Sequence, residues 1–202
     1  MKKVHFILFA AVGLFISSCS TPETDDDSDE LAAIIYELNS ESSSLQWTGS
    51  YGDNSHTGTV SFSEGSMTLQ EGELVGGSFV VDMTTIAEPE GQGLVGHLMG
   101  LDDNERQKPE DFFNTTKFPT VKVILGDYKD GNLSIKLEIL GQSLSTDVAV
   151  IVTGDDKGGS IKGAFDVDFG SLGMLGLMPD PETGAGISPT VKFELDLALT
   201  SI

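Results

Sequence analysis

The sequence predicts an all-β fold: an antiparallel, elongated β-barrel of about eight strands with one short helix or lid. Composition is the first indication, because 24 Gly and 11 Phe accompany frequent β-branched residues, as is typical of strands and tight turns. The second is the alternation of apolar and polar residues in successive segments, which indicates strands with one buried face. The third is length, because strands of roughly ten residues extend about 33 Å, which suits an elongated barrel better than a sandwich.

The first half of the expected barrel consists of short segments separated by turn residues. The segments expected as strands are residues 34–38, 45–47, 56–62, 66–70 and 74–83. Residues 63–65 (Ser-Glu-Gly) and 71–72 (Glu-Gly) are typical of turns, so the third and fourth segments are expected to pair as a hairpin. Gly76-Gly77 favours a bend or bulge in the last segment. One alternative stays open, because residues 31–38 also place apolar side chains on one helical face.

Residues 84–110 interrupt the alternation and are rich in glycine. Leu94 and Leu98 recur there at helical spacing, which predicts one short helix. The segment ends in Asp111-Phe112-Phe113, whose two aromatic side chains cannot both face solvent without exposing a large apolar patch. Pro119 then favours extended geometry at the residue before it. These features predict an apolar plug or lid that leads into the next strand.

After Pro119 the alternation is stricter. The segments expected as strands are residues 121–125, 132–139, 143–152, 161–169 and 191–199. Within residues 132–139, Leu and Ile take every other position, so one face of that strand is apolar. Turns are expected at residues 130–131, 141–142 and 155–159, and Asp130-Gly131 is the strongest of these hairpin signals. Residues 170–188 are expected to form a loop rich in Gly, Met and Pro.

The N-terminal residues 1–18 have the organisation of a signal peptide. Lys2 and Lys3 precede an apolar run at residues 4–16, which is too short to span a bilayer comfortably. Small residues then precede Cys19, and this pattern resembles a bacterial lipobox. We therefore expect cleavage before Cys19, lipidation of Cys19, and anchoring at the outer membrane of a bacterial cell envelope, periplasmic or surface-exposed.

Residues 19–33 are polar and acidic, and they are expected to form a flexible tether ahead of a domain at residues 34–202. The whole chain has 11 Lys and Arg against 32 Asp and Glu, with a formal net charge of −21. Such a chain repels phosphates at long range, which argues against nucleic acid as a partner. Cys19 is the only cysteine, so no disulfide is expected within the domain.

Several short motifs run through the expected domain. They are Leu45-Gln46-Trp47, residues 55–60 (Ser-His-Thr-Gly-Thr-Val), residues 76–83 (Gly-Gly-Ser-Phe-Val-Val-Asp-Met), His97-Leu98, Asp111-Phe112-Phe113, residues 117–120 (Lys-Phe-Pro-Thr) and Phe193-Glu194-Leu195. Their order and spacing over residues 36–199 resemble those of the YceI-like family of the bacterial envelope. The resemblance implies a lipocalin-like barrel that binds a polyisoprenoid or similar apolar lipid, without enzymatic activity and without a cofactor.

The sequence departs from that family in three places. Residues 100–110 separate the His-Leu and Asp-Phe-Phe motifs, which are usually adjacent, so the lid is expected to be longer. Val167 stands where many members carry an arginine in a late strand. Residues 170–188 form a longer and more apolar loop. The absent arginine weakens the case for a bound pyrophosphate head group.

Inward-facing apolar residues are the expected ligand contacts, since in a barrel a bound lipid completes the core. These residues are Trp47, Phe62, Phe79, Val81, Phe112, Phe113, Val121, Val123, Leu125, Leu133, Ile135, Leu137, Phe165, Val167, Phe193 and Leu195. His56 is expected to form a hydrogen bond at the barrel end, and His97 to anchor the lid helix. No residue is assigned to a metal or to catalysis.

Two other functions stay open at this level. The first is a metal-assisted hydrolase that uses His56, His97 and a carboxylate, although the chain has no Gly-x-Ser-x-Gly motif or phosphate-binding loop. The second is a structural surface lipoprotein with a filled barrel. A homodimer is also open. A continuous apolar cavity would favour the lipid-binding hypothesis over the filled barrel.

Overall fold

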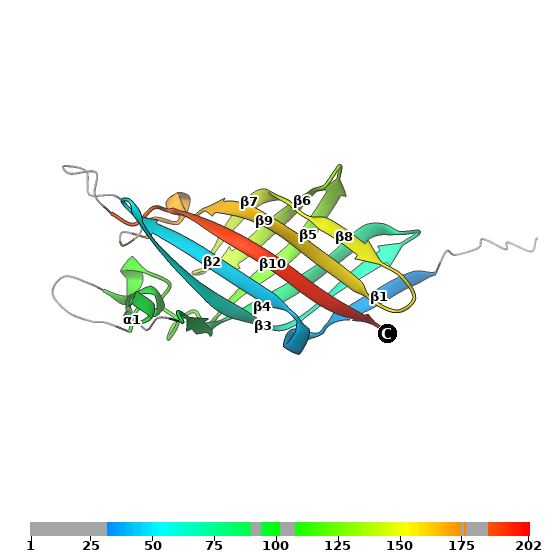
Figure 1. Ribbon diagram of the computed structural model, residues 1–202, viewed down its shortest axis with the longest axis horizontal. Helices are drawn as coiled ribbons and strands as arrows, with labels where there is room; N and C mark the ends of the chain where they lie inside the picture. Colours follow the sequence, from blue (N-terminus) through cyan, green and yellow to red (C-terminus); the bar gives the residue numbers. More distant parts are fainter. Residues whose placement is uncertain (1–31, 90–93, 102–107, 175, 177–185) are drawn as a thin grey trace, which may run out of the picture. The chain divides into compact units, whose positions relative to one another are not determined.

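The computed structural model (Figure 1) describes residues 32–89, 94–101, 108–174, 176 and 186–202. These residues belong to one compact unit, Leu31–Ile202. The predicted signal peptide, Cys19 and nearly all of the predicted tether lie outside the described residues. Among the described residues, no helix is both long enough and apolar enough to span a membrane.

The described chain forms one antiparallel sheet of ten strands. The strands are β1 (Ala33–Leu38), β2 (Ser44–Tyr51), β3 (Asn54–Gln70), β4 (Glu73–Ala87), β5 (Thr120–Lys129), β6 (Asn132–Ile139), β7 (Gln142–Ala149), β8 (Ile151–Gly154), β9 (Gly159–Asp168) and β10 (Thr190–Ser201). The helical elements are α1 (Leu94–Met99) and the single 3₁₀ turns η1 (Ser40–Ser42), η2 (Pro109–Asp111) and η3 (Gly170–Leu172). The strand order is β7-β6-β5-β4-β3-β1-β10-β9-β8, and β2 also pairs with β3 and β10.

Two pairs of strands share one position each, which closes the sheet into a barrel. β1 and β2 both lie between β3 and β10, with η1 between them. β7 pairs with β6 and β8 pairs with β9, and only Val150 separates β7 from β8. The ten strands therefore occupy eight positions around the barrel. The predicted class, an antiparallel all-β barrel of about eight strands, is confirmed.

A side chain from β5 stabilises the interruption between β7 and β8 at Val150. The Tyr128 hydroxyl donates a hydrogen bond to the Val150 carbonyl (3.2 Å) and accepts one from the Val152 amide (3.3 Å). The Val150 amide donates to the Gly131 carbonyl at 2.9 Å. The single strand predicted over residues 143–152 is therefore two strands, because the chain changes partner from β6 to β9 at this point.

The predicted turn at residues 63–65 is wrong. β3 runs without interruption through these residues, with a register shift against β4 between Phe62 and Glu64. Gly65 is needed there for space, because a Cβ on it would lie 2.1 Å from Cδ1 of the Phe79 ring on β4. Gly65 therefore marks a close approach between strands, which a sequence pattern does not separate from a turn.

The predicted turns at residues 71–72 and 130–131 are present, and the turn predicted at 141–142 lies one residue earlier, at 140–141. Each places two consecutive residues at positive φ, as a two-residue hairpin turn of type I′ requires. The bulge predicted near Gly76 is present as a register shift opposite Thr68 and Leu69. The short helix is present as α1, and the helical alternative for residues 31–38 is wrong, because β1 is a strand.

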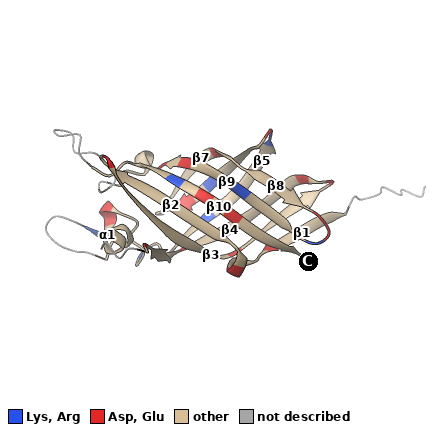
Figure 2. Cartoon of the chain, in the orientation of Figure 1, with Lys and Arg blue, Asp and Glu red and all other residues tan. Residues whose placement is uncertain are grey.

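Charged residues recur along β9 and β10 (Figure 2). On β10, Lys192 and Glu194 are exposed and alternate with half-buried apolar residues. Lys192 pairs with Glu194 at 3.2 Å, and Lys162 on β9 pairs with Asp196 at 3.0 Å. The apolar face of each strand consequently points into the barrel.

Candidate functional site

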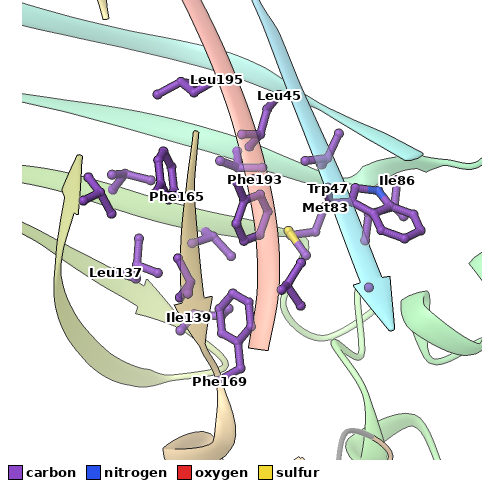
Figure 3. A pocket seen from close by; sticks show the side chains of 18 of the residues that line it. Leu45, Trp47, Met83, Ile86, Leu137, Ile139, Phe165, Phe169, Phe193 and Leu195 are labelled. Carbon is purple, nitrogen blue, oxygen red and sulfur yellow. The ribbon is translucent and has the colours of Figure 1, made fainter. Parts of the chain in front are cut away.

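The interior of the barrel contains a cavity of about 590 Å³. This volume lies within the range of small-molecule sites, about 300–1,000 Å³, and far above the space that a single water needs. Figure 3 shows side chains from several strands pointing into it, among them Trp47, Phe193 and Leu137. The filled-barrel alternative is therefore not supported.

Fifteen of the sixteen apolar residues predicted as ligand contacts line this cavity. They are Trp47, Phe62, Phe79, Val81, Phe113, Val121, Val123, Leu125, Leu133, Ile135, Leu137, Phe165, Val167, Phe193 and Leu195. Phe112 does not line the cavity. Alternation places these side chains on one face of each strand, and closure of the barrel brings those faces together.

Four phenylalanines form one wall of the cavity. The Phe113 and Phe169 rings meet edge to face at 6.0 Å, and Phe169 meets Phe193 at 6.2 Å. Phe193 lies 6.0 Å from Phe165. Such pairs add about 0.5–1.5 kcal/mol beyond area burial, so this wall is a fixed apolar surface that runs from the lid into the barrel.

One end of the barrel, between β1, β3 and β9, is filled with side chains. Tyr36, Met67 and Leu69 are buried there and do not line the cavity. Gly154 and Gly159 make room for them, because a Cβ on either would approach Tyr36 to 3.1 Å or less. We call this the packed end, and the cavity stops short of it.

The hydroxyl of Tyr36 at the packed end donates a hydrogen bond to the Asp155 carbonyl at 3.0 Å. Burial, and then the negative charges of Asp155 and Asp156, raise the pKa of Tyr36 above its ordinary value. The native barrel therefore favours the neutral phenol at this position.

The polar side chains of the cavity lining all come from the β2–β3 hairpin. They are Ser50, Tyr51, Asn54, Ser55 and His56, and every other lining side chain is apolar. We call this the polar end of the cavity. No Lys or Arg is among the described lining residues, and Val167, where many relatives were expected to carry arginine, is buried and lines the wall.

His56 at the polar end forms an ion pair or hydrogen bond with Glu88, just beyond the end of β4. His56 Nδ1 lies 2.7 Å from Glu88 Oε1. The Glu88 side chain is only 2% exposed, and its other oxygen, Oε2, is buried without a hydrogen-bond partner. Glu88 lies in a segment without periodicity, so no sequence signal pointed to it.

The described part of the lid consists of α1 and residues 108–118. Residues 102–107, which connect them, lie outside the described residues. The Phe113 amide donates to the Leu98 carbonyl (3.1 Å), and the Thr115 amide donates to the Met99 carbonyl (2.8 Å). Leu94, Leu98 and Phe113 line the cavity from this side. The predicted lid is thus a short helix tied to the strand-entry segment by backbone hydrogen bonds.

The two predicted histidines have different surroundings. His56 lines the cavity, whereas His97 does not and lies 6.5 Å from the Phe112 ring within the lid. Over the residues that the structure describes, no group of three His, Cys, Asp or Glu side chains is placed to hold a metal ion. The geometry gives no support to a two-histidine metal site.

Several lining residues were not predicted. Examples are Leu45, Val60, Met83, Ile139 and Leu197. Each lies two positions from a predicted lining residue on the same strand, so strict alternation would have identified them. Ile86 and Ile187 also line the cavity, but they come from segments whose alternation is broken.

A family model of the YceI-like domain matches residues 36–199. Among curated proteins none matches this sequence. Among solved structures, BcnA of Burkholderia cenocepacia has a TM-score of 0.60 at 12% identity, covering 80% of this chain and 98% of BcnA. The structure of a mutant CJ YCEI protein with a monobromobimane guest has a TM-score of 0.45 at 14% identity, covering 98% of both chains. BcnA thus shares the fold. The family model covers most of this chain, which shows that the chain belongs to the YceI-like family.

Proposed function

We propose that this protein binds a long apolar lipid of the isoprenoid type inside its barrel and holds it as a membrane-anchored lipoprotein of the bacterial envelope. The observation that carries the lipid-binding part is the apolar cavity of about 590 Å³, whose polar side chains are confined to one hairpin. A cavity of this kind suits a guest that is apolar along most of its length.

The energetics favour recognition of the chain over recognition of the head. Each buried CH₂ contributes about 0.8 kcal/mol, so one five-carbon isoprene unit contributes roughly 3–4 kcal/mol before ordering costs. A charged hydrogen bond to the head adds only about 1.5–3 kcal/mol. Burial of the chain therefore dominates the affinity, and the head group adjusts selectivity.

The lining also bears on the head group. Val167 supplies no positive charge, and the described lining contains no Lys or Arg. An anionic head would enter a site without a counter-charge. We therefore expect lipids with uncharged heads to be preferred over pyrophosphate lipids.

Native mass spectrometry of the purified protein, followed by lipid extraction, tests the lipid-binding proposal. We expect a mass adduct that extraction removes and identifies as a long-chain apolar lipid. Leu137→Trp should displace it, because Leu137 points into the cavity. Lys136→Trp is the matched control, because Lys136 is the sequence neighbour of Leu137 and its side chain is 46% exposed on the outer face. Equal lipid in both variants, or none in the wild type, would contradict the proposal.

The anchoring part rests on the leader and on Cys19. Metabolic labelling with an alkyne fatty acid should mark the wild-type protein, and Cys19→Ser should abolish both the label and recovery in the membrane fraction. A labelled Cys19→Ser protein, or an unlabelled wild type in the soluble periplasmic fraction, would contradict it. This outcome is independent of lipid binding inside the barrel.

A further inference from the structure

We propose that His56 and Glu88 form a head-group site at the polar end of the cavity, and that this site selects an uncharged head carrying a hydroxyl group. The inference rests on the proposed lipid-binding function and adds to it the chemistry of the guest's polar end. It is carried by the geometry of the pair and by the place of His56 in the lining.

His56 lies on the inner face of the barrel, and the buried Glu88 contacts it from outside the cavity lining. His56 shares that face of β3 with Val60 and Phe62, and all three line the cavity. Glu88 follows β4 two residues after Ile86, which also lines the cavity. A guest whose chain lies along Val60 and Phe62 would therefore bring its terminus next to the His56 ring.

The contact with Glu88 determines which atom of His56 can meet a guest. With Glu88 as a carboxylate, which only accepts hydrogen bonds, Nδ1 of His56 is the donor in this 2.7 Å contact. The second ring nitrogen, Nε2, is then the polar atom left for a ligand. Nε2 accepts a hydrogen bond when the ring is neutral and donates one when the ring is protonated.

A hydroxyl group fits both states of the ring, because it is a donor and an acceptor at once. An ether or a ketone only accepts, so it fits the protonated ring alone. Glu88 Oε2 is buried and lacks a hydrogen-bond partner, and as a carboxylate oxygen it can only accept a hydrogen bond from a donor. Both observations favour an alcohol terminus over heads that only accept.

Glu88 also disfavours anionic heads. Its side chain is 2% exposed, so solvent screens its charge poorly. A phosphate placed beside His56 would lie close to this carboxylate, with no Lys or Arg in the described lining to offset the repulsion. The pair thus gives a physical basis for discrimination between an alcohol and its phosphate ester.

A purely structural role for the pair, in which it only ties β3 to the segment after β4, makes a different prediction. Loss of such a tie would change stability and would lower the affinity for every guest alike. A head-group site changes the ratio of affinities among guests that share one chain. The ratio is therefore the quantity to measure.

The test uses three probes with the same twenty-carbon isoprenoid chain: geranylgeraniol, its methyl ether and its monophosphate. Each is titrated into delipidated wild-type protein in competition with a fluorescent fatty-acid probe. We expect the alcohol to bind about fivefold more tightly than the ether, the ratio for one modest hydrogen bond. We expect the phosphate to bind at least tenfold more weakly than the alcohol.

Two variants test whether His56 and Glu88 cause the differences in affinity among the three probes. His56→Phe should make the alcohol and the ether equal, because the ring nitrogens are removed and an apolar ring is kept. Glu88→Gln should raise the affinity for the phosphate roughly tenfold relative to the alcohol, because the buried charge is removed. Val60→Ala is the control, since it removes only chain contacts and should weaken all three probes by the same factor.

The outcomes separate this site from the function on which it rests. If none of the three probes binds, the lipid-binding function fails and the site with it. If all three bind but the wild type does not prefer the alcohol, or both variants keep the wild-type ratios, the head-group site is overturned while lipid binding stands. The wild-type ratios and Glu88→Gln decide the question even if His56→Phe does not fold.

Discussion

Phe112 and Phe113 are adjacent in sequence but have different surroundings. Phe113 lines the cavity and meets the Phe169 ring edge to face at 6.0 Å. Phe112 is 5% exposed and packs inside the lid, where a Cβ on Gly176 would lie 2.5 Å from its Cζ. One phenylalanine thus contributes to the wall of the candidate site, and the other holds the lid together.

This relationship predicts that alanine substitution at the two positions affects different properties. Phe112→Ala should lower the free energy of unfolding by about 3–5 kcal/mol, as expected for a buried aromatic side chain. Phe113→Ala should cost less stability but should reduce the lipid retained through purification. Urea unfolding of the delipidated variants and lipid quantification by mass spectrometry measure the two effects. The assignment fails if Phe112→Ala retains less lipid than the wild type while its free energy of unfolding is unchanged.

Gly65→Ala should destabilise the barrel. The added Cβ would lie 2.1 Å from the Phe79 ring, so the ring or the strand must shift, at a cost of about 1–3 kcal/mol. Gly49→Ala on β2 is the matched control, because nothing lies within 4 Å of its added Cβ, and its effect should stay within about 0.5 kcal/mol. Urea midpoints of the two variants provide the comparison, and equal midpoints would contradict the role of Gly65.

Tyr36→Phe should change how stability depends on pH. The pKa of Tyr36 is raised in the native state, so its contribution is fully present below the unfolded pKa of about 10 and is lost as pH rises through the native pKa. At pH 7 the variant should be about 0.5–1.5 kcal/mol less stable, because it loses the hydrogen bond to Asp155.

Above pH 10 the deficit of Tyr36→Phe should shrink or reverse, because phenylalanine has no proton to lose. Urea unfolding at pH 7 and pH 11 gives the two differences. Tyr51→Phe is the control, since Tyr51 is 49% exposed. A deficit that is the same at both pH values would contradict the assignment.

Tyr128→Phe should weaken the closure of the barrel between β7 and β8. The variant loses the hydroxyl that bonds the Val150 carbonyl and the Val152 amide, and the unfolding free energy should fall by about 1–3 kcal/mol. Hydrogen exchange should accelerate at the Val152 amide more than at amides of β5. Unchanged protection of Val152 would show that the hydroxyl does not hold the break.

The sequence by itself determined which face of each strand is apolar. Leu133, Ile135 and Leu137 alternate with Ser134 and Lys136, and side chains that alternate along a strand must point to opposite faces. The same rule identified most of the cavity wall, and the positive-φ turns at Gly72 and Gly131 were evident from residue type.

Only the tertiary structure decided which glycines turn the chain and which make room for a ring, as Gly65 does for Phe79. Tertiary contacts also moved the chain from β6 to β9 at Val150, separated Phe112 from Phe113, and brought Glu88 to His56. The physical reason is range. Alternation is a local property of neighbouring residues, whereas the space around a glycine, the choice of strand partner and the His56–Glu88 contact depend on residues that are far apart in sequence.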